Sequence, residues 1–319
     1  MKFLIYGPNY NATDRLFDDI KVLSNVEYIH HPIRNKFLRK FYNFYMETFN
    51  NKFLNYFWYL IALKSNKNID TCYLYLGSAN IKFAVDTDFV KYCKKRNPNS
   101  VHVGYYLDIH AAKKIHNDYY NKIFDDLYIF DQNEAQKLNV NYYCLPYSKL
   151  DINTKVYSSQ KKSDLYFVGQ AKSRYNKLIE IFEYCEKNNI KTDFYIIGVP
   201  AKDQQYKDKI HYIDFIPYED VLKIMLNSNC GVELMVDGAT SYSQRVLEAF
   251  VYGKKIISDN IYLRDAFFYD EEVIEIFQDV RDINSDFILN QREYNKKEEN
   301  IFSPINFLKM IEKKYSHTK

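Results

Sequence analysis

Short apolar runs alternate with amphipathic segments along most of the chain. The runs end at Gly, Pro or an acidic residue and predict buried strands, and apolar residues three and four apart predict helices between them. The main predicted strands are Phe3–Tyr6, Val26–His30, Thr71–Leu76, Val101–Leu107, Asp126–Phe130, Tyr142–Leu145, Asp164–Gly169, Asp193–Gly198, Ile210–Ile213, Gly231–Val236 and Lys255–Ser258. This alternation predicts an α/β fold.

The pattern is interrupted once and then begins again. Residues 147–163 are polar and lack periodicity, which is typical of a linker. A length of 319 residues is enough for two domains. We expect an N-terminal domain over 1–150 and a C-terminal domain over 164–300. A final helix after Pro304, within 301–319, is expected to pack back toward the first domain.

The stretch 241–260 combines a predicted helix with candidate chemistry. Ser241 and Gln244 have the spacing of a capping box at its start, Ser243 is a second candidate cap, and Gly253 is placed to end it. Its apolar stripe consists of Val246, Leu247, Phe250 and Val251. Because the helix follows a predicted strand, its N-terminus faces the carboxyl edge of a sheet, where anions bind.

Two further side chains of this helix allow two interpretations. Arg245 at the helix start suits the phosphates of a nucleotide sugar, and the Glu248 carboxylate suits hydroxyl groups because it only accepts hydrogen bonds. Alternatively, the two side chains are three apart and form a surface ion pair worth about 0.3 kcal/mol.

Polar residues also follow predicted strands in the first half. Gly7, Asn9 and Asp14 lie in the loop after the first strand, a position where open α/β sheets bind ligands. Asp108 and His110 follow the strand 101–107 and are candidates for a general base, although an Asp can equally cap the next helix.

Residues 34–64 interleave many aromatic side chains with basic ones. The longest uncharged run, 53–63, is about half of what spans a bilayer. The segment is either a pair of helices with an aromatic core stripe or a surface that lies on an anionic membrane. Nucleic acid would also suit such a surface, but the sequence contains no recognisable nucleic-acid-binding motif.

Composition further limits the classes of protein and of partner that the sequence fits. A hydrophobic content of 47% with 27% charged residues is globular, and a net charge of +3 is too small to indicate a nucleic-acid partner. The five cysteines are scattered without metal-ligand spacing, as expected for core residues in a reducing compartment. Asp86-Thr-Asp88 matches a helix start better than a metal site. Met1 leads directly into a predicted strand, so we expect a cytoplasmic protein without a signal peptide.

The second half resembles the donor-binding half of GT-B glycosyltransferases. No GxGxxG occurs in either half, which argues against a dinucleotide oxidoreductase. The resemblance rests on Phe167-Val-Gly169 with Lys172 and Arg174, Ile196-Ile-Gly198, Phe215-Ile-Pro-Tyr-Glu-Asp220, and Glu248 to Ile257. The whole chain also resembles, in outline, small glycosyltransferases of bacterial lipopolysaccharide core or capsule. The resemblance implies two Rossmann-like domains facing a cleft. The N-terminal domain would bind the acceptor, with Gly7, Asn9 and Asp14 on the acceptor side, and the C-terminal domain would bind the nucleotide sugar.

The resemblance also implies donor-binding roles for individual residues. Glu248 would accept hydrogen bonds from the ribose, and Arg174 or Lys172 would lie on the diphosphate and stabilise the departing nucleotide. The remaining implied donor contacts are Gly169, Ser241, Ser243 and Arg245 near the phosphates, and Gly198, Ile216 and Pro217 near the nucleobase. In the branch with two glutamates, the first lies eight positions before the second, where this chain has Thr240. The sequence therefore does not choose between retention and inversion.

We expect a metal-independent hexosyl- or deoxyhexosyltransferase without a cofactor. Its nucleotide-sugar donor would serve a lipopolysaccharide core, O-antigen or capsule acceptor, at the inner face of the plasma membrane. Two alternatives are a CDP-polyol phosphotransferase and a non-catalytic GT-B-like binding protein. The first usually needs paired histidines, and the C-terminal half offers only His211 and His317.

Overall fold

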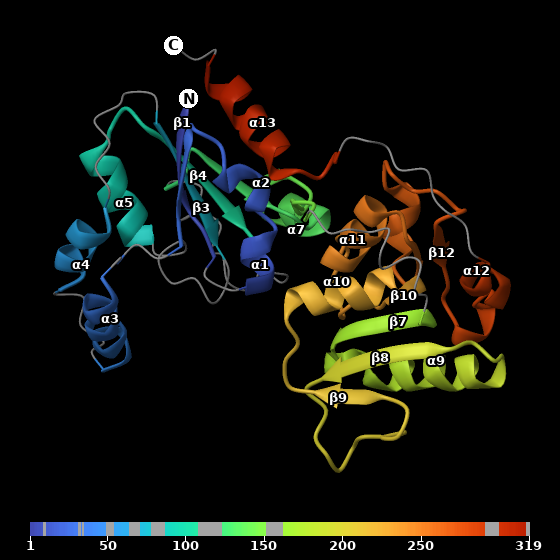
Figure 1. The fold of residues 1–319 in the computed structure, drawn as a ribbon. Helices are drawn as coiled ribbons and strands as arrows, with labels where there is room; N and C mark the ends of the chain where they lie inside the picture. Colours follow the sequence, from blue (N-terminus) through green and yellow to red (C-terminus); the bar gives the residue numbers. More distant parts are fainter. Residues whose placement is uncertain are drawn as a thin grey trace. The chain divides into compact units, whose positions relative to one another are not determined.

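The computed structural model divides into two compact units (Figure 1). They are Met1–Ser148 with Ser303–Lys319, and Lys149–Phe302. The structure describes residues 1–8, 11–30, 33, 35–48, 54–63, 71–77, 87–107, 123–150, 162–290 and 300–316. Each unit contains a six-stranded sheet whose strands all pair in parallel, which confirms the predicted α/β fold class.

The first unit has the strand order β2-β1-β3-β4-β5-β6. The strands are β1 Lys2–Tyr6, β2 Val26–Ile29, β3 Thr71–Gly77, β4 Val101–Tyr106, β5 Asp126–Ile129 and β6 Asn141–Tyr142. The helices are α1 Asn11–Arg15, α2 Asp18–Lys21, α3 Lys36–Thr48, α4 Asn55–Ala62, α5 Thr87–Arg96, α7 Gln132–Lys137 and α13 Pro304–Ser316. Every residue of β3 is buried, as expected for a central parallel strand covered on both faces.

The C-terminal helix α13 belongs to the first unit. Asp126 accepts hydrogen bonds from Lys314 Nζ at 2.7 Å and from Tyr315 Oη at 2.6 Å. The ring of Phe307 lies 4.6 Å from the ring of Tyr143, measured between centroids. Polar contacts and aromatic packing therefore hold this helix against the β5–β6 side of the sheet.

The second unit has the strand order β12-β11-β10-β7-β8-β9. The strands are β7 Ser163–Gln170, β8 Thr192–Ile197, β9 His211–Ile213, β10 Ser228–Glu233, β11 Lys255–Ser258 and β12 Ile274–Ile276. The helices are η3 Lys172–Arg174, α9 Tyr175–Lys187, α10 Tyr218–Leu226, α11 Gln244–Tyr252, η4 Ile261–Asp265, η5 Val280–Asp282 and α12 Ser285–Leu289. From β7 the chain adds β8 and then β9 toward one edge of the sheet. It then returns to the other side of β7, where β10, β11 and β12 follow toward the opposite edge. The strand order thus reverses between β7 and β10, where parallel sheets open a crevice at their carboxyl ends.

Several predicted boundaries are wrong. The predicted strand 231–236 ends at Glu233, and the predicted strand 142–145 is replaced by the short β6. The helix start expected at Asp86-Thr-Asp88 is confirmed, because α5 begins at Thr87. The predicted linker 147–163 lies mostly outside the described residues.

Candidate functional site

The polar groups of the second unit gather at the carboxyl ends of β7 and β10. Arg245, in the first turn of α11, donates a hydrogen bond from Nη2 to the carbonyl oxygen of Val168 at 2.8 Å. Its guanidinium carbon lies 4.7 Å from the ring centroid of Phe167. A Cβ atom at Gly169 would lie 2.9 Å from Arg245 Nη2. Glycine at 169 therefore allows the guanidinium to lie against the end of β7.

Arg174 approaches the same ring from the loop after β7. Its guanidinium donates to the carbonyl oxygens of Leu234, at 2.9 Å, and of Gln170. Its guanidinium carbon lies 5.9 Å from the centroid of the Phe167 ring. Burial first, and then the charge of Arg245, lowers the pKa of Arg174 to about 10. Two partly buried cations thus share one aromatic ring, an arrangement that favours a bound anion.

Glu233 is a buried acid that the sequence analysis missed. Its carboxylate accepts hydrogen bonds from the Ser258 hydroxyl at 2.8 Å and from the Ser243 backbone N–H at 3.2 Å. Burial raises its pKa, while hydrogen bonds from Ser243 and Ser258 and the charge of Arg245 act in the opposite direction. The signal that could have identified Glu233 is the occurrence of an acidic residue inside the apolar run 231–236. Glu233 ties the end of β10 to β11 and to the start of α11.

Glu248 is buried one turn further along α11, with 4% of its surface exposed. Its Oε1 accepts hydrogen bonds from Tyr218 Oη at 2.7 Å and from Gln244 Nε2 at 2.9 Å. No group in the described ranges donates a hydrogen bond to its Oε2. Burial raises the pKa of Glu248 to about 7. The carboxylate is positioned by two donors and has one oxygen left for a ligand hydroxyl.

The predicted capping box of α11 is wrong. The N-cap is Ser243, and its side chain makes no capping hydrogen bond. Ser241 is buried, and its carbonyl oxygen accepts from Asn260. Gln244 donates to Glu248 instead of completing the box. The alternative of an Arg245–Glu248 ion pair is not seen either, since each side chain binds other groups. The predicted helix end is confirmed, because Gly253 adopts the left-handed conformation with φ of 65°.

A pocket of about 600 Å³ opens beside the ends of β7 and β8. Gly198 lines it with φ of 81°, a conformation that side-chain-bearing residues rarely adopt. Its lining also includes Ala171, Lys172, Tyr175, Asn176, Val199, Pro200, Lys202, Asp203 and Gln205. Ile216 and Pro217 are not among the lining residues, and Pro217 instead precedes α10 as its N-cap. The structure therefore places Lys172, expected near the phosphates, and Gly198, expected near the nucleobase, at one pocket, and it leaves Ile216 and Pro217 outside the lining of that pocket.

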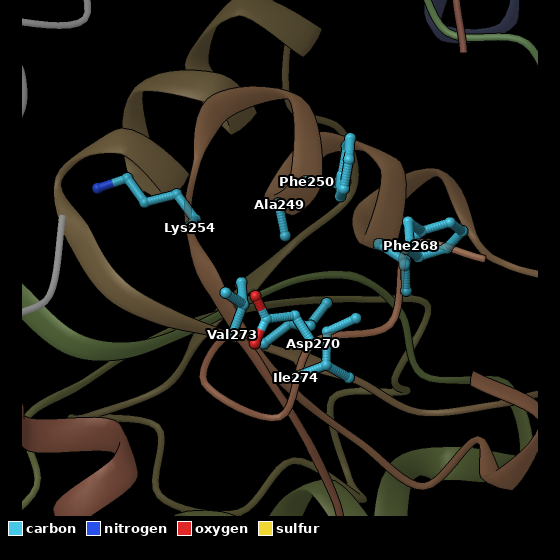
Figure 2. Close-up of a pocket in the computed structure, with 9 residues that line it drawn as sticks. Ala249, Phe250, Lys254, Phe268, Asp270, Val273 and Ile274 are labelled. Carbon is cyan, nitrogen blue, oxygen red and sulfur yellow. The ribbon is translucent and has the colours of Figure 1, made fainter. Parts of the chain in front are cut away.

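A second pocket is lined by α11 and by residues between 254 and 274 (Figure 2). Figure 2 shows Ala249 of this helix pointing toward Val273 and Ile274, while the Phe250 ring packs against the ring of Phe268. Its volume is about 10 Å³, room for roughly one water molecule. Because this space is so small and its lining is almost entirely apolar, it is a gap in the packing.

The first unit uses two of its predicted site residues internally. A Cβ atom at Gly7 would lie 2.1 Å from the Tyr28 hydroxyl oxygen, so glycine is required by packing. Asp14 pairs with Lys21 at 2.7 Å and with His30 at 3.2 Å. Asn9, Asp108 and His110 lie outside the described residues.

The remaining sequence predictions concern two histidines, the Asp86-Thr-Asp88 motif, metal binding and membrane spans. His211 lies on β9, its ring 4.5 Å from that of Tyr195, and His317 is outside the described ranges. Asp88 pairs with Lys91 at 3.6 Å, and Asp86 is not described. In the described part of the chain, no three His, Cys, Asp or Glu side chains gather as metal ligands. Among the helices that are described, none combines the length and the hydropathy needed to cross a bilayer.

Comparison with known proteins indicates similarity at the level of the fold. No family model matches the sequence, and no curated protein matches it. One similar solved structure is an alpha-glucosyltransferase in complex with UDP and a 13-mer DNA containing an HMU base. It has 12% identity and a TM-score of 0.54 over 90% of this chain and 88% of that one. Two further solved structures are less similar. The spinosyn rhamnosyltransferase SpnG complexed with thymidine diphosphate has 8% identity and a TM-score of 0.42 over 97% of this chain and 92% of that one. TarM has 14% identity and a TM-score of 0.44 over 66% of this chain and 46% of that one. The chain has the α/β fold of GT-B glycosyltransferases, with two Rossmann-like units.

Proposed function

We propose that the protein is a glycosyltransferase that uses a nucleotide-sugar donor bound by the second unit. The observation that carries the proposal is the pair Arg174 and Arg245 on the ring of Phe167, at the point where the strand order reverses. An anion at this edge of the sheet would replace water around two partly desolvated cations. The similar alpha-glucosyltransferase is described in complex with UDP, which supports a nucleotide as the kind of ligand that we propose.

Each part of the donor matches a part of this site. The diphosphate lies against Arg174 and Arg245, whose charges would stabilise the leaving nucleotide. Oε2 of Glu248 accepts a ribose hydroxyl, since Oε1 is already engaged. The nucleobase enters the pocket lined by Lys172 and Gly198. These groups supply charge stabilisation from the protein itself, so we propose a transferase that needs no metal.

The acceptor assignment follows from the sequence resemblance alone. We propose transfer of a hexose or deoxyhexose to a bacterial surface glycan or glycolipid, such as lipopolysaccharide core, O-antigen or capsule. Such acceptors are assembled at the cytoplasmic face of the plasma membrane, where we place the protein. Asp108 or His110 would take the acceptor proton if the reaction inverts the anomeric centre.

Thermal unfolding with a panel of UDP, GDP, CDP, dTDP and CMP tests the proposal. A nucleotide at a hundredfold excess over its Kd stabilises the folded state by roughly 2.7 kcal/mol. We expect stabilisation by at least one nucleotide and a smaller effect in Glu248→Ala. Absence of stabilisation by every nucleotide would exclude the proposed donor site.

A further inference from the structure

Exposed large hydrophobic side chains concentrate on the two helices α3 and α4 of the first unit. Of the fifteen such side chains among the described residues, seven belong to this segment. We call these seven exposed side chains the aromatic face: Phe37, Phe41, Phe44, Leu54, Tyr56, Phe57 and Leu60. Soluble proteins rarely expose so many large apolar groups in one short segment without a binding partner.

Helical spacing places the α3 members of this face side by side. Phe37, Phe41 and Phe44 are separated by four and three residues and are 67%, 52% and 60% exposed. The rings of Phe37 and Phe41 contact each other with centroids 4.9 Å apart. The three exposed rings therefore lie along one side of α3, and we call them its stripe.

The opposite sides of the two helices are packed together, which makes the aromatic face a fixed surface. The Trp58 ring of α4 lies 5.4 Å from Tyr42 and 6.2 Å from Tyr45 of α3. The backbone N–H of Leu54 donates to the Tyr45 hydroxyl at 3.2 Å. The aromatic residues of this segment thus divide into an inner set that forms core and an outer set that remains exposed.

Basic side chains border the aromatic face. Lys36 and Lys40 are exposed, one turn apart, and each directly precedes a phenylalanine of the stripe. On the α4 side, the Tyr56 ring lies 6.0 Å from the ring of Tyr92, and the Arg96 guanidinium carbon lies 5.4 Å from the same ring. The described sequence of α3 and α4 contains one acidic residue, Glu47. The border of the aromatic face therefore carries positive charge.

We propose that the aromatic face binds the surface of an anionic lipid bilayer, with its rings in the headgroup region and its cations on lipid phosphates. Aromatic side chains on one side of a helix with flanking lysines are typical of segments that lie in the membrane interface. A second copy of the chain fits less well, because a two-fold contact would bring Lys36 and Lys40 toward their own counterparts. Binding to lipid is independent of glycosyl transfer and can be measured without turnover.

Vesicle flotation tests this inference on the full chain. We expect the protein to float with vesicles that contain phosphatidylglycerol and to remain below with pure phosphatidylcholine vesicles. Since each lysine near an anionic surface contributes about a fivefold factor, Lys36→Gln with Lys40→Gln should reduce binding about 30-fold. Added salt should weaken binding of the wild type.

A second variant tests the apolar part of the interaction. Phe37→Gln, Phe41→Gln and Phe57→Gln together should reduce binding at least about tenfold. Glutamine favours helix at least as well as phenylalanine, and an unchanged melting curve would show that the fold is intact. Lys187→Gln and Phe267→Gln replace exposed residues of the second unit and should bind like the wild type.

Three results would overturn the inference. In the first, the wild type does not float with anionic vesicles while it still binds nucleotide. In the second, the aromatic variant floats as well as the wild type. In the third, sedimentation shows a wild-type dimer that the aromatic substitutions separate, with vesicle binding unchanged. That last result would assign the aromatic face to contact between copies.

Discussion

Glu248 provides a prediction that links stability to the proposed site. Its carboxylate is buried, and burial raises its pKa from 4.5 to about 7. Between these two pH values the folded protein holds a proton that the unfolded chain has released. The stability due to this group is therefore complete below pH 4.5 and is lost as the pH rises through about 7.

Glu248→Gln removes this charge while keeping the shape of the side chain. The amide oxygen can still accept from Tyr218 and Gln244, as Oε1 does now. A pKa difference of about 2.5 units corresponds to about 3 kcal/mol, so the variant should exceed the wild type in unfolding free energy by up to that amount at pH 8. Near pH 5 the difference should be small, because the wild-type side chain is then mostly neutral.

Urea unfolding at pH 5 and pH 8 measures this difference, with Glu271→Gln as a control at an exposed position of the same unit. The control should match the wild type at both pH values. The same Glu248→Gln variant should bind nucleotide more weakly, since an amide is a poorer acceptor for the ribose hydroxyls. Equal stability of variant and wild type at pH 8, or a difference that does not change with pH, would refute the account of Glu248 as a buried carboxylate with a raised pKa.

Three further substitutions test other contacts. Gly169→Ala places a methyl group against the Arg245 guanidinium. In calorimetry we expect the Kd for nucleoside diphosphates to rise about tenfold or more, with little change in melting temperature. An unchanged Kd would contradict this expectation. Tyr218→Phe removes one donor to Glu248 and should lower the unfolding free energy at pH 8 by about 1.5–3 kcal/mol, whereas no loss would show the bond to be unimportant. Asp126→Ala breaks both hydrogen bonds from α13 and should make this helix the first site of limited proteolysis, unlike the wild type.

The strands were predictable where continuous apolar runs encode them. β3, β7 and β11 begin and end within one residue of their predicted bounds, because a central parallel strand is buried on both faces and needs an apolar residue at each position. The end of α11 at Gly253 was also predictable, since the left-handed conformation favours glycine locally. Between 261 and 290 the elements are short turns of helix and one edge strand, which leave little periodic signal.

The candidate site was predictable only in part. Arg174 and Arg245 were identified, but the contacts that place them on Phe167 depend on three separate parts of the chain. The capping-box prediction is wrong because Gln244 has two candidate partners nearby, the backbone at Ser241 and the carboxylate of Glu248. Since Glu248 is buried, Gln244 donates its hydrogen bond to that carboxylate. Glu233 was missed because its donors come from positions 10 and 25 residues away, and only the folded sheet brings them together.

Calorimetric titration of nucleoside diphosphates and monophosphates tests the donor site most directly. The wild type should bind a diphosphate more tightly than the matching monophosphate, because the proposed site sets Arg174 and Arg245 against the second phosphate. Arg245→Gln should reduce this preference, because Arg174 remains, and Arg264→Gln, at an exposed position of the same unit, should retain it in full. Equal affinity of the wild type for the two nucleotides, or an undiminished preference in Arg245→Gln, would contradict the proposed donor site.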